Sequence, residues 1–285
     1  MKKSSLIFLI VVFCVNTSIA GETNVLHQAS VMGDLEEVKK ALKSGIKVSS
    51  KDETGNSPLH LAGSPEVVEF LIKKGANIHM KNSLGWTALH TASNVEVAES
   101  LIKNGANVNA KSDTGDTPLH IFENIKKVSL LIKSGANINA KDNLGSTPLH
   151  SSENIKKSSL LIKSGANINA KDNLGNTPLH RANDIKIAQL LLNKGADIKA
   201  KNDEGDMPIH ALVKNYQASS TAVILPLIKL YIKRGVSINI RNGSNNTVLA
   251  EVEEMIKVAG ITEDQETTKQ YTELKKELIK LGAKK

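Results

Sequence analysis

Histidine is the residue whose type and spacing in this sequence could do chemistry. Six histidines close near-identical phrases such as Thr-Pro-Leu-His at intervals of 30 residues. Imidazole binds zinc and exchanges protons near neutral pH, so the row raises the hypothesis of a metal or acid–base site. The row consists of His60, His90, His120, His150, His180 and His210, and His27 precedes it by 33 residues.

Geometry argues against a shared metal ion. Neighbouring helices pack about 8–10 Å apart, whereas each imidazole on a zinc ion lies about 2.0–2.1 Å from the metal. Equivalent histidines of adjacent repeats therefore cannot share an ion unless the stack bends. We expect these histidines to be structural, and we expect neither a metal nor a cofactor.

Three serines form the other group that could suggest catalysis. Ser151, Ser152 and Ser158 stand where the preceding repeat has Ile121, Phe122 and Val128. No histidine–carboxylate pair repeats beside them, as a serine nucleophile would need. We interpret them as an underpacked repeat, and we predict no catalytic residue and no enzymatic activity.

The elements that carry these side chains repeat along the chain. Residues 121–150 and 151–180 differ at only four of 30 positions. A period in this range predicts stacked helical units that bury their apolar faces against one another. Most residues of the sequence are therefore expected to build and stack these units.

Residues 55–84 show how one repeat is expected to fold. Ser57 and Pro58 begin a short first helix, and Ser64 with Pro65 begins a second helix in the same way. Val67, Val68, Leu71 and Ile72 place one apolar stripe on this second helix. A glycine then ends the second helix, and a polar turn follows. The terminal glycines are Gly45, Gly75, Gly105, Gly135, Gly165, Gly195, Gly235 and Gly282.

These phrases resemble the ankyrin repeat over most of residues 23–250. The shared features are Thr-Pro-Leu-His, a Leu-Leu or Leu-Ile pair, and Gly-Ala-Asn-Ile-Asn-Ala-Lys-Asp before the turn. The resemblance implies an all-α solenoid of about eight helix-turn-helix units with protruding β-turns. It also implies that each histidine bonds to the turn of the neighbouring repeat. The repeats here are three residues shorter than the usual ankyrin length, which predicts first helices about one turn shorter.

The seventh and last repeats depart from the pattern. Both helices between His210 and Gly235 are predicted to be longer, with Pro226 kinking or delaying the second. Residues 255–285 are expected to form a C-terminal capping helix, with Thr262 and Gln265 as a capping box. The predicted domains are a signal peptide (1–20), ankyrin repeats (21–254) and this cap (255–285).

A row of cations occupies one position of each turn. If the turn tips align, this row forms a basic edge that suits an acidic protein surface. Lysine is also common at this ankyrin position, and a merely solvated row is the alternative. Its members are Lys51, Lys81, Lys111, Lys141, Lys171, Lys201 and Arg241. The helix lysines Lys126, Lys127, Lys156 and Lys157 share this ambiguity.

Trp86 is the only tryptophan and follows Gly85 at the start of a repeat. Equivalent positions carry small polar residues such as Asn56 and Asp116, which indicates an exposed site. An exposed tryptophan there would be a binding anchor. Packing against the adjacent turn is the alternative interpretation.

The first 20 residues are typical of a secretory signal peptide. Lys2 and Lys3 precede an apolar run from Leu6 to Val15, and Ser18-Ile19-Ala20 resembles a cleavage site. Cleavage would remove Cys14, the only cysteine, so no disulfide framework is expected. The net charge of +8 would fall to +6, and few aromatic side chains remain to stack on bases, which disfavours nucleic acid as a partner.

These observations predict a non-enzymatic scaffold for protein–protein interaction in the bacterial envelope. It would bind a protein partner, one with an acidic surface if the basic row makes contact, through its concave face and turn tips. The expected location is the periplasm or outside the cell, without membrane insertion after cleavage. The alternative is a secreted effector that binds a host protein.

Overall fold

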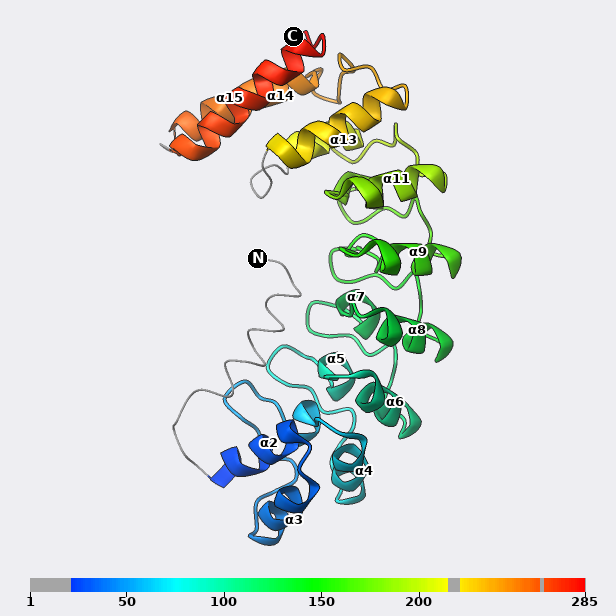
Figure 1. Ribbon diagram of the computed structural model, residues 1–285, viewed down its shortest axis with the longest axis vertical. Coiled ribbons are helices and arrows are strands. Elements are labelled where there is room, and N and C mark those ends of the chain that lie inside the picture. The colour runs from blue at the N-terminus through cyan, green and yellow to red at the C-terminus, as the bar shows by residue number, and fades with distance from the viewer. Residues whose placement is uncertain (1–21, 215–220, 262–263, 285) are drawn as a thin grey trace. The chain divides into compact units, whose positions relative to one another are not determined.

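The computed structural model describes residues 22–214, 221–261 and 264–284. The described part of the chain contains helices, turns and loops and no strand, as the all-α prediction requires. The chain divides into two compact bodies, residues 1–143 and 144–285. Each body stacks helix pairs along its length (Figure 1). The expected signal peptide lies outside the described residues.

The described part of the N-terminal body, from residue 22 onward, contains four helix pairs. Their first helices are short after the initial one, because the 30-residue repeats lack three residues at this point. The first helices are α2 (Glu22–Met32), η1 (Pro58–Leu61), α5 (Ala88–Thr91) and α7 (Pro118–Ile121). The second helices are α3 (Leu35–Lys43), α4 (Pro65–Lys73), α6 (Val95–Lys103) and α8 (Ile125–Lys133).

The C-terminal body continues the pattern with one gap. Its helices are α9 (Ile155–Lys163), α10 (Pro178–Arg181), α11 (Ile185–Asn193), α12 (Pro208–Lys214), α13 (Thr221–Lys233), α14 (Val248–Ile261) and α15 (Gln265–Lys280). Residues 148–151, where the sequence predicts a first helix, form a turn instead. The lengthening of the seventh helix pair is confirmed, and Pro226 lies inside α13.

Caps and glycines set the ends of the second helices. The Asn94 side chain accepts the Val97 amide at 2.8 Å, and Ser64 caps α4 in the same way. Gly75 follows α4 with φ of 90°, a conformation that favours glycine. Asp264, and not Thr262, is the N-cap of α15: its carboxylate accepts the amide of Thr267 at 3.0 Å. Thr262 lies outside the described residues.

The core runs between the two helices of each repeat. Val67, Val68 and Leu71 are fully buried on α4, and Leu59 of the first helix is buried opposite them. In the C-terminal body, Tyr231 and Tyr271 are the largest fully buried side chains among the described residues. The expected domain boundary between residues 254 and 255 falls inside α14. Among the described residues, no helix is both long and apolar enough to cross a membrane.

Candidate protein-binding surface

The histidines connect the start of one repeat to the turn of the following repeat. In the N-terminal body, His60 Nε2 lies 2.9 Å from the Trp86 carbonyl oxygen, and His90 Nε2 lies 3.1 Å from that of Asp116. In the C-terminal body, His150 and His180 make the same contact at 3.0 Å. Because the partner is a carbonyl, Nε2 carries the proton and donates.

The other ring nitrogen, Nδ1, accepts a hydrogen bond at the N-terminus of the histidine's own helix. The amide of Thr87 donates to His90 Nδ1 at 3.1 Å, and the Thr87 hydroxyl lies 2.9 Å from the same nitrogen. Burial lowers the pKa of His90 from 6.5 to about 4. A buried neutral imidazole that uses both nitrogens within the fold is a structural group. Among the described residues, no group of three or more His, Cys, Asp or Glu could hold a metal ion.

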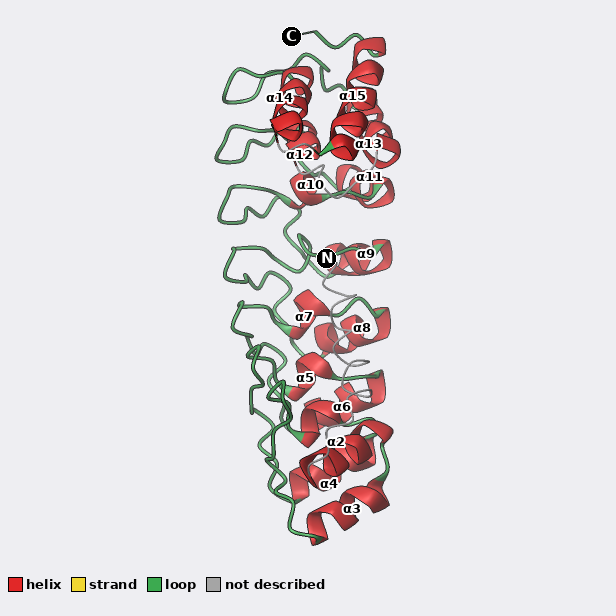
Figure 2. Cartoon of the chain, turned by 90° about the vertical axis from the view of Figure 1, so that its left-hand side faces the viewer, coloured by secondary structure: helices red, strands yellow, loops and turns green. Residues whose placement is uncertain are grey.

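Adjacent turns form backbone hydrogen bonds with one another. In the N-terminal body, the Ser83 amide donates to the Thr54 carbonyl at 3.2 Å, and in the C-terminal body the Asn173 amide donates to the Leu144 carbonyl at 2.9 Å. A Cβ on Gly85 would lie 2.1 Å from Asp113, so glycine permits this close approach. The turns of each body project to one side of its helices (Figure 2).

The cationic row lies at these turns, and all seven side chains are exposed. Within the N-terminal body, the Lys51 ammonium donates to the Lys81 carbonyl at 3.3 Å, and Lys111 donates to the Lys141 carbonyl at 2.8 Å. In the C-terminal body, Lys171 donates to the Lys201 carbonyl at 2.9 Å. These bonds direct the lysines along the row.

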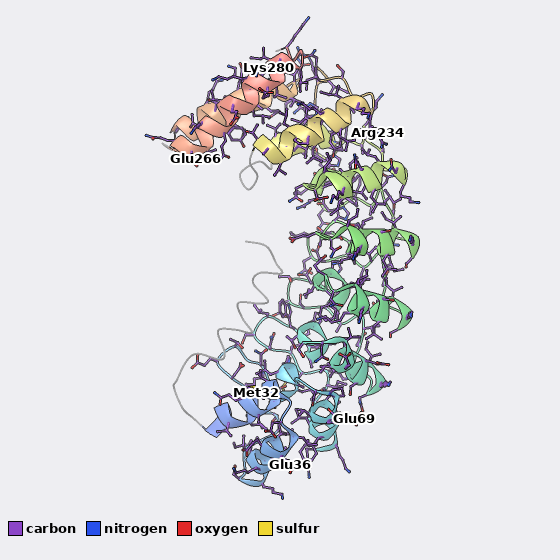
Figure 3. All side chains as sticks on the ribbon, viewed as in Figure 1. Met32, Glu36, Glu69, Arg234, Glu266 and Lys280 are labelled. Carbon is purple, nitrogen blue, oxygen red and sulfur yellow. The ribbon has the colours of Figure 1, made fainter. Side chains whose placement is uncertain are left out.

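Helices α3, α4 and α6 carry mixed charges instead, whereas α8 carries lysines and no acid. On α3, Lys39 pairs with Glu36 at 2.7 Å. Glu36 and Glu69 are both exposed on second helices of the N-terminal body (Figure 3). The turn row is therefore more uniformly basic than α3, α4 and α6, although Glu53 and Asp113 are also exposed there.

Trp86 is partly buried, and the reasoning that its position is normally exposed is wrong. Asn56 is 3% exposed and Asp116 is 5% exposed, because these side chains bond beneath the turns. The Asn56 side-chain amide, for example, donates to Thr54 Oγ1 at 2.6 Å. Trp86 therefore replaces a group that belongs to the interior of the turn, and only part of its ring faces solvent.

Two of the helix lysines are turned into the fold, one of them buried and the other partly buried. Lys157 is fully buried on α9. The Lys127 ammonium donates to the Ala92 carbonyl at 2.8 Å and lies 4.1 Å from the centre of the Phe122 ring. Burial lowers the pKa of Lys127. Lys126 and Lys156 are exposed.

Exposed leucines at the turn tips were missed by the sequence analysis. Leu84 is 45% exposed, Leu144 66% and Leu174 63%. Thr54 and Thr114 occupy the same position in other repeats. These leucines could have been identified in the sequence as apolar residues at a turn position that is polar in other repeats.

A shallow groove of about 450 Å³ lies between α13 and α15 in the C-terminal body. Its polar lining includes Glu266, Lys269, Glu273 and Glu277, and Leu225 supplies apolar surface. Figure 3 labels Glu266 at the start of α15. None of the residues that the sequence analysis singled out for binding lies in this groove.

The paired helices, the interlocked turns and the histidine bonds define a helical repeat protein. A family model for ankyrin repeats in three copies matches residues 4–82, 26–112, 62–142, 94–172 and 122–202. The chain belongs to the ankyrin repeat family.

One solved structure extends this comparison. The ankyrin repeat domain of Bcl-3, described as a unique member of the IkappaB protein family, is 30% identical, with a TM-score of 0.56. The similarity covers 71% of this chain and 97% of that one. No curated protein matches the chain in the sequence comparison. Ankyrin repeats are protein–protein interaction scaffolds, and the family is generally non-catalytic.

Proposed function

We propose that this protein is a non-enzymatic scaffold of the bacterial envelope that binds a partner protein through its turn tips and first helices. The observation that carries the proposal is the row of exposed cations on interlocked turns. Stacked repeats give an extended surface whose contact residues are set repeat by repeat. An acidic surface on the partner complements such a row.

The contact residues that we propose in the N-terminal body are Lys51, Lys81, Lys111, Lys141 and the exposed part of Trp86. In the C-terminal body they are Lys171, Lys201 and Arg241. Envelope residence is proposed from the signal-like residues 1–20. If the protein is instead exported into a host cell, its partner there is a host protein.

Affinity capture from the native envelope tests the binding. The K81Q/K111Q/K141Q variant removes three turn cations, and the matched control K73Q/K103Q/K133Q removes three exposed lysines from the ends of second helices. We expect the first variant to lose a captured partner and the control to retain it. Equal capture by the two variants would contradict the proposed surface.

Cell fractionation tests the location. Retention of the cleaved chain in the periplasm supports an envelope role. Recovery of the chain in the medium or in host cells supports the effector role. An uncleaved chain in the cytoplasm contradicts both.

A further inference from the structure

The C-terminal body presents an exposed leucine at the same position of two consecutive copies of one turn phrase. Residues 141–145 and 171–175 both read Lys-Asp-Asn-Leu-Gly. Leu144 and Leu174 are each more than 60% exposed, and the Asn173 amide bonds to the Leu144 carbonyl at 2.9 Å. The two leucines therefore lie on adjacent turns whose backbones are hydrogen-bonded to each other. We name Leu144, Leu174, Lys171 and Lys201 the twin-leucine surface.

Asp172, the acidic residue in the phrase at residues 171–175, does not present an exposed negative charge at this surface. Asp172 is fully buried, where it accepts the amides of Leu174 and Asn176 and pairs with Arg181. Residues 144–146 and 171–176 consequently carry one exposed charge, Lys171. Lys201 adds a second exposed cation on the next turn, where Asp203 and Glu204 are also exposed and Glu204 pairs with Lys214 at 3.0 Å. Lys171 thus lies on the turn of Leu174 itself, and Lys201 follows one turn further along.

The repeat spacing restricts the shape of a ligand that reaches both leucines. Packed helices lie about 8–10 Å apart, and the turns follow the same repeat. A polyproline II segment rises about 3.1 Å per residue with three residues per turn, so its residues i and i+3 face the same side about 9 Å apart. Such a segment can place one apolar side chain on each leucine.

We propose that the twin-leucine surface binds an acidic polyproline II segment of a partner protein, with an apolar residue at every third position. This inference rests on the proposed function and specifies the partner. The apolar residues contact Leu144 and Leu174, because covering exposed leucine removes apolar area from water. Carboxylates on the intervening positions face Lys171 and Lys201. A lysine that donates to a carbonyl retains its positive charge for this pairing.

The probe is a fluorescent peptide of four Pro-Asp-Leu units, titrated with the full chain and followed by anisotropy. The decisive variant is L144T/L174T, because threonine is the native residue at the equivalent positions 54 and 114. We expect saturable binding that weakens at least tenfold in this variant. K171Q/K201Q should also weaken binding and reduce its salt dependence. The matched control K156Q/K186Q removes two exposed lysines from second helices and should bind like the wild type.

Two further peptides separate the contributions. Replacing every Asp by Asn tests charge, and replacing every Leu by Ser tests the apolar anchors; each change should weaken binding at least tenfold. Failure of the Pro-Asp-Leu peptide to bind, or equal binding by wild type and L144T/L174T, would overturn the inference. Envelope capture that survives L144T/L174T would leave the scaffold function standing with a different contact, whereas absence of any captured partner would count against the scaffold function itself.

Discussion

Mild acid should destabilise this protein through its buried histidines, and His90 gives the clearest case. Its Nδ1 accepts the Thr87 amide and its Nε2 donates to the Asp116 carbonyl, so the folded protein holds the neutral ring. Protonation of Nδ1 would set its N–H against the N–H of Thr87. Acidification therefore favours the unfolded chain, where the ring is free to take up a proton.

The magnitude follows from the pKa difference. Burial lowers the pKa of His90 from 6.5 in the unfolded chain to about 4 in the fold. The stability is fully present above pH 6.5 and is lost as the pH falls from 6.5 towards 4. Between pH 7.5 and pH 5 this histidine alone should remove about 2 kcal/mol, since one pKa unit corresponds to about 1.4 kcal/mol. The pKa values of His60, His150, His180 and His210 are also lowered by burial, so their contributions have the same sign.

Urea unfolding followed by circular dichroism at several pH values between 7.5 and 5 measures this effect. The slope of the unfolding free energy against pH gives the number of protons taken up on unfolding. H90Q should lower that slope, because glutamine does not titrate. H79N supplies the control: it removes an exposed histidine from a turn position that carries Asn109, Asn139 and Asn169 in other repeats. A stability that stays constant from pH 7.5 to 5, or equal slopes for H90Q and H79N, would refute the reasoning.

Three further predictions concern the scaffold. Backbone amides of residues 151–165 should exchange with deuterium faster than those of residues 181–195, because residues 148–151 form no helix to cover α9; equal protection would count against this. R181A should destabilise the C-terminal body by about 1–2 kcal/mol in urea unfolding, because it removes two hydrogen bonds from a buried carboxylate, whereas K186Q should change little. G85A should destabilise the fold at least twice as much as G75A, which costs about 1 kcal/mol from its left-handed backbone alone, because only Gly85 also approaches a neighbouring turn; equal melting temperatures would contradict this.

The helix pairs could be predicted from the sequence because their signals are local. A cap such as Asn94, an apolar stripe and a glycine such as Gly75 specify a nine-residue helix without reference to distant residues. The hydrogen bond between a histidine and the turn of the next repeat is implied by the resemblance to ankyrin repeats. The surface role of the turn cations stays a prediction.

The missing first helix could not be predicted from its own residues. The phrase Thr-Pro-Leu-His occurs at residues 117–120, 147–150 and 177–180, yet the middle copy alone forms no helix. Helices of four residues have no stability of their own and depend on packing. Ile121 and Phe122 are buried beside the first copy, whereas Ser151 and Ser152 offer no comparable apolar area.

The candidate surface was predicted incompletely for a related reason. Asn56 and Trp86 occupy equivalent positions, and the sequence does not show that the position bonds beneath the turn. Without that knowledge a polar residue indicates exposure, which made Trp86 appear more accessible than it is. The same pattern hid Leu144 and Leu174, since apolar residues suggest a core and these two lie at tips.

The Nε2 bonds of His60, His90, His150 and His180 end on main-chain oxygens, and this has an evolutionary consequence. The acceptors at Trp86, Asp116, Asn176 and Asp206 belong to three different residue types, yet each carbonyl occupies the equivalent position in its repeat. After duplication or deletion of a 30-residue block, the histidine of one repeat would still face a main-chain carbonyl of the next repeat, whatever side chains that repeat carries. A repeat of 30 residues can therefore be duplicated or deleted without loss of this hydrogen bond, and the near-identity of residues 121–150 and 151–180 fits such a duplication.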